Sequence, residues 1–462
     1  MSDTAVWYHT FGCKANQYDT ERMRQELESR GAATVAEPGL AQAAVLNTCT
    51  VTNRADAAAR RLIRRLGREH PDLRIVVAGC SAALRAEAYG RMPGVAGVVA
   101  GADPVAVALE VAPEVGLASA DAEPIGGLLL RANARGTRGW LKIQDGCDRR
   151  CSFCATRLAR GASRSRPADE IVREAALLAH RHAELVLTGI HIGHYGRDLT
   201  PADSLAALCE RLLDAVPAVR FRLGSVEATE IDDRLVDLLA TSGGRLAPHL
   251  HVPLQSGSDA ILRAMRRWHT REAYRRRVLE IAARVDPLGL GADVIVGFPG
   301  ETQADHALTR ALVEELPFTY LHVFPFSPRD GTPAAGLPDR PPQRVAAGRS
   351  RELREIAVRK GRGHVAARLG GEALVAVETP ESGLTGDYLR VRMTVPGAEP
   401  ATLVRMRLGG CAEDPRAAVS RSRPGRGRGG GGGGGGPRAA LPVLTASSVA
   451  AGRPPPEREK VS

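Results

Sequence analysis

The first hundred residues alternate short apolar runs with segments that have helical periodicity. Three of the runs have the length of strands, and each ends in a cysteine: AVWYHTFGC (5–13), AAVLNTC (43–49) and RIVVAGC (74–80). This alternation is typical of βαβ units and predicts an open parallel sheet. The carboxyl ends of such strands meet at one edge of the sheet, where ligands bind. We therefore expect the thiols of Cys13, Cys49 and Cys80 to converge at that edge.

The alternation returns in the middle of the chain after an interruption. Residues 103–138 are rich in small residues, which predicts the last strand and helix of the first domain and then a connector, with a boundary at 128–138. From Trp140 onward, six more apolar runs alternate with helical segments: WLKIQDG, ELVLTGI, RFRLGSVE, HLHVPLQ, GADVIVGF and YLHVFPFS. Six such β/α units predict a partial barrel. Polar or glycine-rich sequence follows the strands, so we expect the active site at their carboxyl ends.

The end of the chain changes character twice. After a helical stretch, residues 372–410 alternate apolar and polar positions between Gly and Pro turns, which predicts a small antiparallel barrel of four or five strands. Beyond Ala412 the sequence is dominated by Gly, Arg and Pro, and we expect it to be disordered. We therefore predict an α/β protein with four parts: an open βαβ domain (1–127), a partial (β/α)6 barrel (138–365), a small β-barrel (366–411) and a disordered tail (412–462).

Composition narrows the class of protein. Eight cysteines in 462 residues are too few for a disulfide scaffold, and their clustering indicates reduced, metal-binding thiols of a cytoplasmic protein. The chain has no run of 18 apolar residues and no secretory start, so we expect neither membrane insertion nor export. A formal charge of +11, carried mostly by Arg, fits a polyanionic partner. A genome-wide bias toward Arg and Ala, together with a basic tail, explains the charge equally well.

The stretch GCDRRCSFC places Cys147, Cys151 and Cys154 in the spacing C-x3-C-x2-C, directly after the first barrel strand. A structural zinc site closes with four Cys or His ligands, and an electron-transfer iron–sulfur cluster normally takes four thiolates. No fourth ligand is near these three in the sequence. Three thiolates on a cluster of four irons leave one iron open to a substrate or cofactor, which indicates a reactive site.

This motif at the start of a β/α barrel resembles that of the radical S-adenosylmethionine enzymes. The resemblance implies that the open iron chelates S-adenosylmethionine and that the reduced cluster cleaves it to a 5′-deoxyadenosyl radical. It also implies cofactor contacts from Phe153, Gly189, Ser225, Glu227 and Gly297, the last of them within DVIVGFPGE. Without the resemblance, a glycine at a strand end indicates a tight turn, and an isolated Ser or Glu indicates a solvated side chain.

The cysteines near the amino terminus have two interpretations. A single free Cys is most often a small buried hydrophobe. Three of them at the same end of consecutive strands favour a second cluster with an open iron. Of the two remaining cysteines, Cys209 lies among leucines at helical spacing and is interpreted as a core residue, and Cys411 as incidental.

The complete pattern, over about residues 6–410, resembles the methylthiotransferases, the MiaB-like family, which have an amino-terminal cluster domain, a radical barrel and a carboxy-terminal TRAM domain. The motifs that carry the resemblance are the two cysteine triplets, HVPLQSGSD, GFPGET and FSPRDGTPAA. It implies two 4Fe–4S clusters, of which the amino-terminal one holds or delivers sulfur. It also implies that S-adenosylmethionine serves as radical source and methyl donor, and that a methylthio group replaces the hydrogen at C2 of an adenine.

Two motifs, GCKANQYDTE and NTCTVTNRAD, are most similar to the MtaB type of this family, which modifies N6-threonylcarbamoyladenosine beside the anticodon of tRNA. Family members that act on N6-isopentenyladenosine or on a ribosomal protein aspartate share the cysteines, so these substrates are alternatives. A noncatalytic iron–sulfur regulator that binds RNA is the alternative from another class. The chain also departs from the family, which commonly continues its last cysteine as CIIPYARG. Here the sequence is CATRLARG, with Arg157 and Leu158 in place of Pro and Tyr.

The resemblance implies the anticodon stem-loop of tRNA as a partner and a flavodoxin or ferredoxin as electron donor, and it leaves the sulfur source open. Arginine offers phosphate a fixed fork of donors and stacks on bases. We expect RNA contacts from the arginines that follow the barrel cysteines: Arg157, Arg160, Arg164 and Arg166. A second set is either an RNA contact or a solvated helix face: Arg60, Arg61, Arg64, Arg65 and Arg68. The TRAM-like barrel resembles an RNA-binding module, but Tyr388 is its only aromatic residue for stacking.

Overall fold

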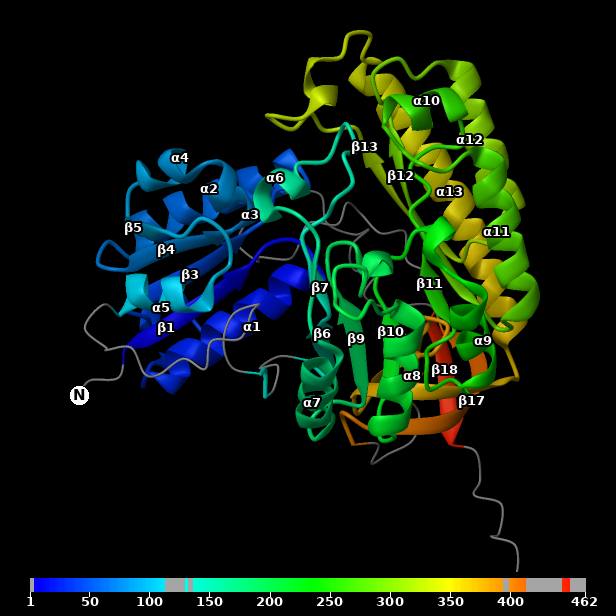
Figure 1. Ribbon diagram of the computed structural model, residues 1–462, viewed down its shortest axis with the longest axis horizontal. Coiled ribbons are helices and arrows are strands. Elements are labelled where there is room, and N and C mark those ends of the chain that lie inside the picture. The colour runs from blue at the N-terminus through cyan, green and yellow to red at the C-terminus, as the bar shows by residue number, and fades with distance from the viewer. Residues whose placement is uncertain (1–3, 113–128, 132–135, 394–398, 413–442, 449–462) are drawn as a thin grey trace, which may run out of the picture.

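The computed structural model describes residues 4–112, 129–131, 136–393, 399–412 and 443–448. Figure 1 shows an amino-terminal α/β domain in blue beside a larger barrel in green and yellow, with a small β-barrel in orange and red at the lower end of the larger one. The predicted fold class is confirmed in these three folded parts.

The amino-terminal domain is a parallel sheet flanked by helices. Its elements are β1 (Ala5–Thr10), α1 (Lys14–Ser29), β2 (Ala33–Thr34), η1 (Pro38–Leu40), β3 (Ala43–Thr48), α2 (Asn53–Glu69), β4 (Arg74–Gly79), α3 (Cys80–Leu84), α4 (Ala86–Gly90), β5 (Val95–Val98) and α5 (Pro104–Val111). The strand order is β2-β1-β3-β4-β5, and all neighbours are parallel. Helices α1 and α5 share one core with the sheet and α2 shares another, so every residue of β3 is buried.

The central part is a partial barrel of six parallel strands, as predicted. The strands are β6 (Arg138–Lys142), β9 (Glu184–Thr188), β10 (Arg220–Leu223), β11 (His249–His251), β12 (Gly289–Val296) and β13 (Tyr320–Pro325). They form two sheets of three strands each, in the orders β10-β9-β6 and β11-β12-β13. A single parallel bridge between Ser225, which follows β10, and His251 of β11 connects the two sheets, and Phe221 of β10 forms a bridge with Leu246 before β11.

Helices cover the outside of this barrel, and short elements follow its strands. The longer helices are α7 (Ala168–Ala179), α8 (Leu205–Ala215), α9 (Asp233–Thr241), α11 (Arg271–Arg284), α12 (Gln303–Glu315) and α13 (Gln343–Arg368). The short elements are β7 (Gln144–Asp145), α6 (Thr156–Arg160), β8 (Arg164–Ser165), η2 (Ile192–His194), η3 (Ala228–Glu230), α10 (Asp259–Ala264) and η4 (Pro333–Gly336). Among the described helices, none combines the length and the apolar character needed to cross a bilayer.

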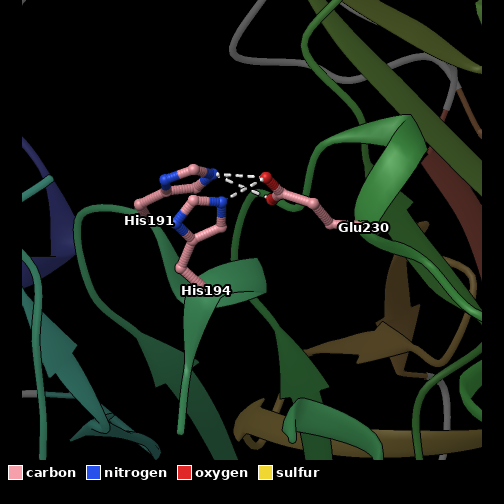
Figure 2. Close-up of side chains that lie close together, drawn as sticks. All are labelled: His191, His194 and Glu230. Atoms are coloured by element: carbon pink, nitrogen blue, oxygen red, sulfur yellow. Dashed lines mark hydrogen bonds and ion pairs between the residues drawn. The ribbon is translucent and has the colours of Figure 1, made fainter. Parts of the chain in front are cut away.

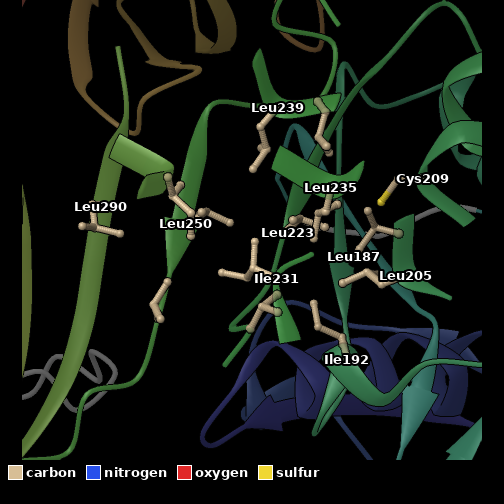
Figure 3. Close-up of a cluster of buried hydrophobic side chains, with 14 of the residues drawn as sticks. Leu187, Ile192, Leu205, Cys209, Leu223, Ile231, Leu235, Leu239, Leu250 and Leu290 are labelled. Carbon is tan, nitrogen blue, oxygen red and sulfur yellow. The ribbon is translucent and has the colours of Figure 1, made fainter. Parts of the chain in front are cut away.

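Leucines of the strands and helices form the barrel core, part of which is drawn in Figure 3. Leu187 of β9 and Leu223 of β10 are 0% exposed and pack in one cluster with Leu235 of α9. Cys209 of α8 belongs to the same cluster and is 1% exposed. Its predicted role as a core residue is therefore confirmed.

The carboxy-terminal part is a closed barrel of five strands. They are β14 (Glu372–Thr379), β15 (Ser382–Thr385), β16 (Arg390–Met393), β17 (Leu403–Ala412) and β18 (Val443–Ser448), and the order around the barrel is β14-β15-β16-β18-β17. Neighbouring strands are antiparallel except β16 and β18, which are parallel. Closure removes the two open edges that β16 and β17 would otherwise present.

Strand β18 corrects the prediction that residues 412–462 form a disordered tail. The prediction is wrong for 443–448, because this short run supplies the strand that completes the barrel. Leu444 is 0% exposed and belongs to the core of the small barrel. The glycine-rich composition around the run concealed it. The rest of the predicted tail, residues 413–442 and 449–462, lies outside the described residues.

A buried ion group fastens the small barrel to the amino-terminal ends of β9 and β10. Glu184, Arg220 and Arg222 are each 0% exposed, and Arg222 donates to Glu184 at 2.9 Å. Both arginines also donate at 2.9 Å to main-chain oxygens of the small barrel, those of Leu384 and Thr385. Burial alone would raise the pKa of Glu184, but the two guanidinium groups hold it below its ordinary value. Because the small barrel docks at the amino-terminal ends of these strands, it does not cover their carboxyl ends, where the candidate site lies.

Candidate active site with two groups of three cysteines

The three distant cysteines of the first domain come together at the carboxyl edge of its sheet. Cys13 precedes α1, Cys49 follows β3, and Cys80 is the first residue of α3. The side-chain oxygen of Asn16 lies 3.8 Å from the sulfur atoms of both Cys13 and Cys80. Cys49 reaches the same place, since a Cβ atom on Gly12 would lie 2.5 Å from its sulfur. We call Cys13, Cys49 and Cys80 the amino-terminal cysteine group.

A glycine precedes three of the six cysteines, and the backbone explains why. Gly12, Gly79 and Gly146 have φ angles of +103°, +94° and +69°, which glycine adopts readily and other residues do not. A Cβ atom on Gly146 would also lie 1.8 Å from the carbonyl oxygen of Ala162. Glycine at each of these three positions therefore permits the turn that brings the thiol of the next residue to the site.

We expect Gly12→Ala to remove most of the iron bound by the amino-terminal cysteine group. The new methyl group would collide with the sulfur of Cys49, and a backbone strain of about 1–3 kcal/mol adds to the collision. Iron per chain after anaerobic reconstitution checks this in a variant that lacks the barrel cysteines. Gly101→Ala is the matched control, since Gly101 has a φ of +111° but no atom within 4 Å of an added Cβ. Equal iron loss in both variants would contradict the role of the collision.

The other three cysteines lie on the loop between β7 and α6, beside the carboxyl end of β6. Hydrogen bonds from Ser152 hold the loop: its N–H donates to the carbonyl oxygen of Met265 at 3.0 Å and its hydroxyl to that of Ala264 at 2.7 Å. The main-chain N–H of Cys154 donates to the carbonyl oxygen of Cys151 at 3.2 Å, which folds the end of the loop back on itself. We call Cys147, Cys151 and Cys154 the barrel cysteine group.

Burial favours the protonated form of three of the six thiols, those of Cys49, Cys80 and Cys147. It raises the pKa of Cys49 to about 12, that of Cys80 to about 11 and that of Cys147 to about 11. A metal ligand must be a thiolate, so iron binding has to displace these protons.

The donor sets fit clusters of four irons in which one iron has no protein thiolate. Each group offers three thiols, and Cys209, the other cysteine whose side chain is described, lies in the barrel core. Cationic groups approach the sulfur atoms of both groups. Nε of Arg160 lies 3.0 Å from the sulfur of Cys80, and Nη1 of Arg267 lies 3.6 Å from that of Cys151. These donors offset the negative charge that three thiolates would bring.

Contacts between the first domain and the barrel set the two groups on a common boundary. Arg160, the last residue of α6, reaches from the barrel to Cys80. On the loop after β13, Nη2 of Arg329 donates to the hydroxyl of Thr50 at 2.7 Å. The side chain of Asn53 donates to the carbonyl oxygen of Pro328 at 2.9 Å. Part of the predicted active-site loop FSPRDGT therefore docks the residues that follow Cys49.

A histidine–glutamate group that the sequence did not predict lies beside the barrel cysteines. Figure 2 shows His191, His194 and Glu230 together at the carboxyl ends of β9 and β10. Nε2 of His191 lies 2.8 Å and Nε2 of His194 lies 3.0 Å from the carboxylate oxygens of Glu230. Nδ1 of His191 lies 3.6 Å from the sulfur of Cys147. The H-x-x-H spacing in TGIHIGHYG was the available signal, but only the fold adds Glu230 to it.

The side chains of this group resemble a metal site, but Arg149 already supplies the positive charge. Its Nη2 lies 3.1 Å from both Glu230 and Nε2 of His194, and its guanidinium lies 3.9 Å from the ring centre of Trp268. A divalent cation on the same atoms would be repelled at that distance. Burial alone would raise the pKa of Glu230, but the two histidines hold it below its ordinary range. We interpret the group as an anchor that orients His191 toward Cys147.

Glu227, a predicted cofactor residue, is connected to the barrel cysteine group through Arg267. It is buried and accepts a hydrogen bond from Nη2 of Arg267, whose Nη1 points to Cys151. The side chain of Arg267 is 4% exposed, and its Nε has no partner among the described residues. Phe153 is half-buried and packs against an apolar cluster that contains Phe298. No pattern in the sequence pointed to Arg267, which connects the predicted carboxylate of Glu227 to the predicted ligand Cys151.

The other predicted cofactor residues lie at strand ends. Gly189 follows β9, and an added Cβ would lie 2.7 Å from the carbonyl oxygen of Gln144. Ser225 is exposed after β10. Gly297 follows β12 with a φ of +71°, and its N–H donates to the carboxylate of Glu301 at 2.5 Å. Their contacts with a cofactor remain predictions.

The four arginines predicted to bind RNA fall into two classes. The side chains of Arg160 and Arg166 are 5% and 3% exposed, and Arg166 donates to Glu174 at 2.9 Å. Such burial argues against RNA contact for these two. Arg164 is exposed, and the half-buried Arg157 donates to a main-chain oxygen of the cysteine loop at 2.8 Å. RNA contact therefore stays a prediction for Arg164 and Arg157.

Two family models match the chain. Residues 5–101 match a family described as uncharacterized protein family UPF0004, and residues 141–312 match the radical SAM superfamily. The first range contains the amino-terminal cysteine group, and the second contains the barrel cysteine group.

Curated relatives cover most of the chain. A protein of Rickettsia prowazekii named threonylcarbamoyladenosine tRNA methylthiotransferase MtaB is 34% identical over 389 residues, which are 83% of this chain and 90% of the relative. The MtaB of Bacillus subtilis is 37% identical over a match that covers 74% of this chain and 77% of the length of that relative. A protein of Acidithiobacillus ferrooxidans named tRNA-2-methylthio-N(6)-dimethylallyladenosine synthase is 33% identical over 81% of this chain and 86% of its own.

Among solved structures, the radical S-adenosylmethionine methyltransferase TsrM of Kitasatospora setae matches with a TM-score of 0.53. The match covers 72% of this chain and 77% of that chain at 15% identity. At this identity the likeness concerns the fold alone.

Proposed function

The chain belongs to the radical S-adenosylmethionine tRNA methylthiotransferases, and on this premise we propose that it inserts a methylthio group at C2 of N6-threonylcarbamoyladenosine beside the anticodon of tRNA. The observation that carries the proposal is the meeting of two three-cysteine groups at one domain boundary, with Arg160 reaching from the loop of one to a thiol of the other. The names of the MtaB relatives support the choice of nucleoside.

The family uses S-adenosylmethionine and 4Fe–4S clusters, and the two cysteine groups fit the clusters. We assign the barrel cysteine group to the cluster that binds S-adenosylmethionine and the amino-terminal cysteine group to the cluster that holds or delivers sulfur. When bound, these cofactors supply the radical, the sulfur and the methyl group. This chain's own residues position these cofactors and set the electrostatic environment around them.

Three features of the site support this division. The hydrogen bonds of Ser152 fix the barrel loop, so the thiols have a defined orientation before any metal binds. Nη1 of Arg267 directs an N–H donor at the sulfur of Cys151, and Nδ1 of His191 lies 3.6 Å from the sulfur of Cys147. Such donors tune the electronics of a cluster. The boundary with the first domain brings Cys80 to the same side of the barrel.

Mass spectrometry of tRNA nucleosides tests the function. The reconstituted protein is incubated anaerobically with S-adenosylmethionine, a reductant and tRNA that carries N6-threonylcarbamoyladenosine. We expect that nucleoside to gain one methylthio group. A gain on N6-isopentenyladenosine alone would move the substrate to that of the other curated relatives. Tight RNA binding without any cleavage of S-adenosylmethionine would replace the enzyme with an iron–sulfur regulator.

We also propose the setting in which the enzyme works. Open iron–sulfur clusters need a reducing compartment, which supports the cytoplasm and a flavodoxin or ferredoxin as electron donor. The small barrel, residues 366–411 together with β18, is proposed as a TRAM-like RNA-binding module. In the second set of arginines, all on α2, Arg60 pairs with Asp56 at 2.7 Å, while the other four members of the set are exposed and offer tRNA a basic face: Arg61, Arg64, Arg65 and Arg68.

We expect Arg164→Ala to weaken tRNA binding and to reduce the slope of log affinity against log salt by about 1, because one phosphate contact is lost. Filter binding at several salt concentrations measures the slope. Arg276→Ala is the control: its side chain is 68% exposed on α11, on the far side of the barrel from α6 (Figure 1). Equal slopes in both variants would remove Arg164 from the RNA-binding surface.

A further inference from the structure

We propose that Arg160 is a positioning residue that fixes the amino-terminal cysteine group against the barrel and donates a hydrogen bond to the sulfur of Cys80. The inference rests on the proposed function only for its effect on product formation. The hydrogen bond itself is a property of the two domains and requires no substrate.

All three nitrogens of the Arg160 guanidinium have partners. Nε lies 3.0 Å from the sulfur of Cys80, and Nη2 donates to Asn16 and Asp19, each at 2.7 Å. Nη1 donates to both carboxylate oxygens of Asp145, at 3.0 and 3.1 Å. Three of these partners belong to the first domain, and Asp145 belongs to the barrel. One side chain therefore joins the two parts at the cysteine group itself.

Charge and burial make this junction specific. Lys142 also donates to Asp19 at 2.7 Å and to Asp145 at 2.6 Å, so two cations and two carboxylates balance one another. The side chains of Arg160, Asp19 and Asp145 are 5%, 4% and 12% exposed. The two terminal nitrogens of Arg160 bond to the carboxylates, and Nε points to the sulfur of Cys80. A lysine cannot reproduce this pattern, since its ammonium is a single point charge without a planar fork.

The position of Arg160 along the chain links the placement of one cysteine group to that of the other. It lies six residues after Cys154, at the end of the short helix α6 that follows the barrel cysteines. Cys80 opens α3, and Asn16, the neighbour of two thiols, binds the same guanidinium. A shift of α6 would therefore move the two cysteine groups relative to each other. Transfer of sulfur from one group to a substrate held over the other depends on that distance.

Water can enter this region when the guanidinium is removed. Cys80, Arg160 and the two carboxylates line a cavity of about 370 Å³ between the first domain and the barrel. Solvent in the cavity can hydrate Asp19 and Asp145 in a variant. We therefore expect substitutions of Arg160 to leave a folded chain.

The first experiment measures the reduction potential of the amino-terminal cluster. It uses chains in which the barrel cysteines are Ala, so that only one cluster forms. Reduction adds negative charge to the cluster, and an N–H aimed at a ligand sulfur stabilises that charge. We expect Arg160→Gln and Arg160→Lys to retain iron and to shift the potential to more negative values. An unchanged potential in both variants, with iron retained, would overturn the inference.

Arg166→Lys is the matched control for this measurement. Arg166 is also a buried arginine of the barrel, and its Nη1 lies 3.3 Å from the hydroxyl of Tyr18 in the first domain. Among the described residues its side chain bonds to Tyr18, Lys142 and Glu174 and to none of the six cysteines. We expect its substitution to leave the potential unchanged. A shift as large as that of the Arg160 variants would assign the effect to general loosening of the domain boundary and overturn the specific role.

The second experiment measures coupling between the two groups in chains with all six cysteines. We expect Arg160→Gln to continue to form 5′-deoxyadenosine, while the ratio of methylthio product to 5′-deoxyadenosine falls about tenfold, within the range that outer ligand partners show. A proportional loss of both would overturn the positioning role. If the unsubstituted chain forms no methylthio product on any tRNA, the proposed function fails, and the potential shift still decides the role of Arg160.

Discussion

Replacement of Cys147, Cys151 or Cys154 by Ala is expected to abolish both 5′-deoxyadenosine formation and the methylthio product. Each of these residues is one of three thiols on a loop held by Ser152, and the other described cysteines lie on other elements, in the first domain or in the barrel core. Loss of an outer partner of a metal ligand typically costs about 10–100-fold in activity, so loss of a ligand is expected to cost more than about 100-fold. Both readouts fall because cleavage of S-adenosylmethionine precedes sulfur insertion.

Anaerobic incubation with S-adenosylmethionine and a strong reductant, followed by quantification of 5′-deoxyadenosine, checks this result. Cys209→Ala serves as the control, because Cys209 is a cysteine of the same barrel that is 1% exposed in its core. We expect this control to keep its cleavage activity and to lose only packing. Undiminished cleavage in the Cys147→Ala, Cys151→Ala and Cys154→Ala variants would remove the barrel cysteine group from the radical chemistry.

Replacement of Cys13, Cys49 or Cys80 is expected to have the opposite pattern: 5′-deoxyadenosine is still formed, and the methylthio product is lost. These thiols lie in another domain, and their contact with the barrel passes through Arg160 and the loop of Arg329. The barrel loop keeps its own hydrogen bonds when one of them is removed. Sulfur insertion fails because the second cluster no longer has its three ligands.

The measurement compares the two products in the same reaction, with circular dichroism to verify the fold of each variant. Thr10→Val is a useful control, since Thr10 ends β1 next to the site and its hydroxyl donates to Thr20 instead of a cysteine. Equal loss of 5′-deoxyadenosine in the two cysteine groups, with folding intact, would reject the division of labour between them.

Together the two results would separate radical formation from sulfur delivery. The histidine group and Arg267 would then act in radical formation, because they contact Cys147 and Cys151. Arg160 and Asn16 belong to the second through Cys80. The charged partners Arg160 and Arg267 lie on the barrel side of the boundary, and the neutral partner Asn16 lies in the first domain.

The sequence by itself determined the strands, the six clustered cysteines and the edge at which three of them meet. These features have local signals in the sequence. An apolar run indicates a strand, and a glycine directly before a cysteine permits a turn that places the thiol at the end of the strand. The periodicity of the six barrel strands predicted β6, β9, β10, β11, β12 and β13. Local signals failed for β18, because the run 443–448 stands alone among glycine, arginine and proline and pairs with strands more than thirty residues away.

Only the tertiary structure decided what the charged residues do. The sequence grouped Arg160 with Arg164 as RNA contacts, yet one is buried against Cys80 and the other is exposed. The difference comes from Asn16 and Asp19, which lie more than 140 positions earlier in the chain. Glu230 likewise completes the histidine group only because β9 and β10 are neighbours. A charged side chain takes its role from the groups that pack against it, and packing between distant segments leaves no local pattern in the sequence.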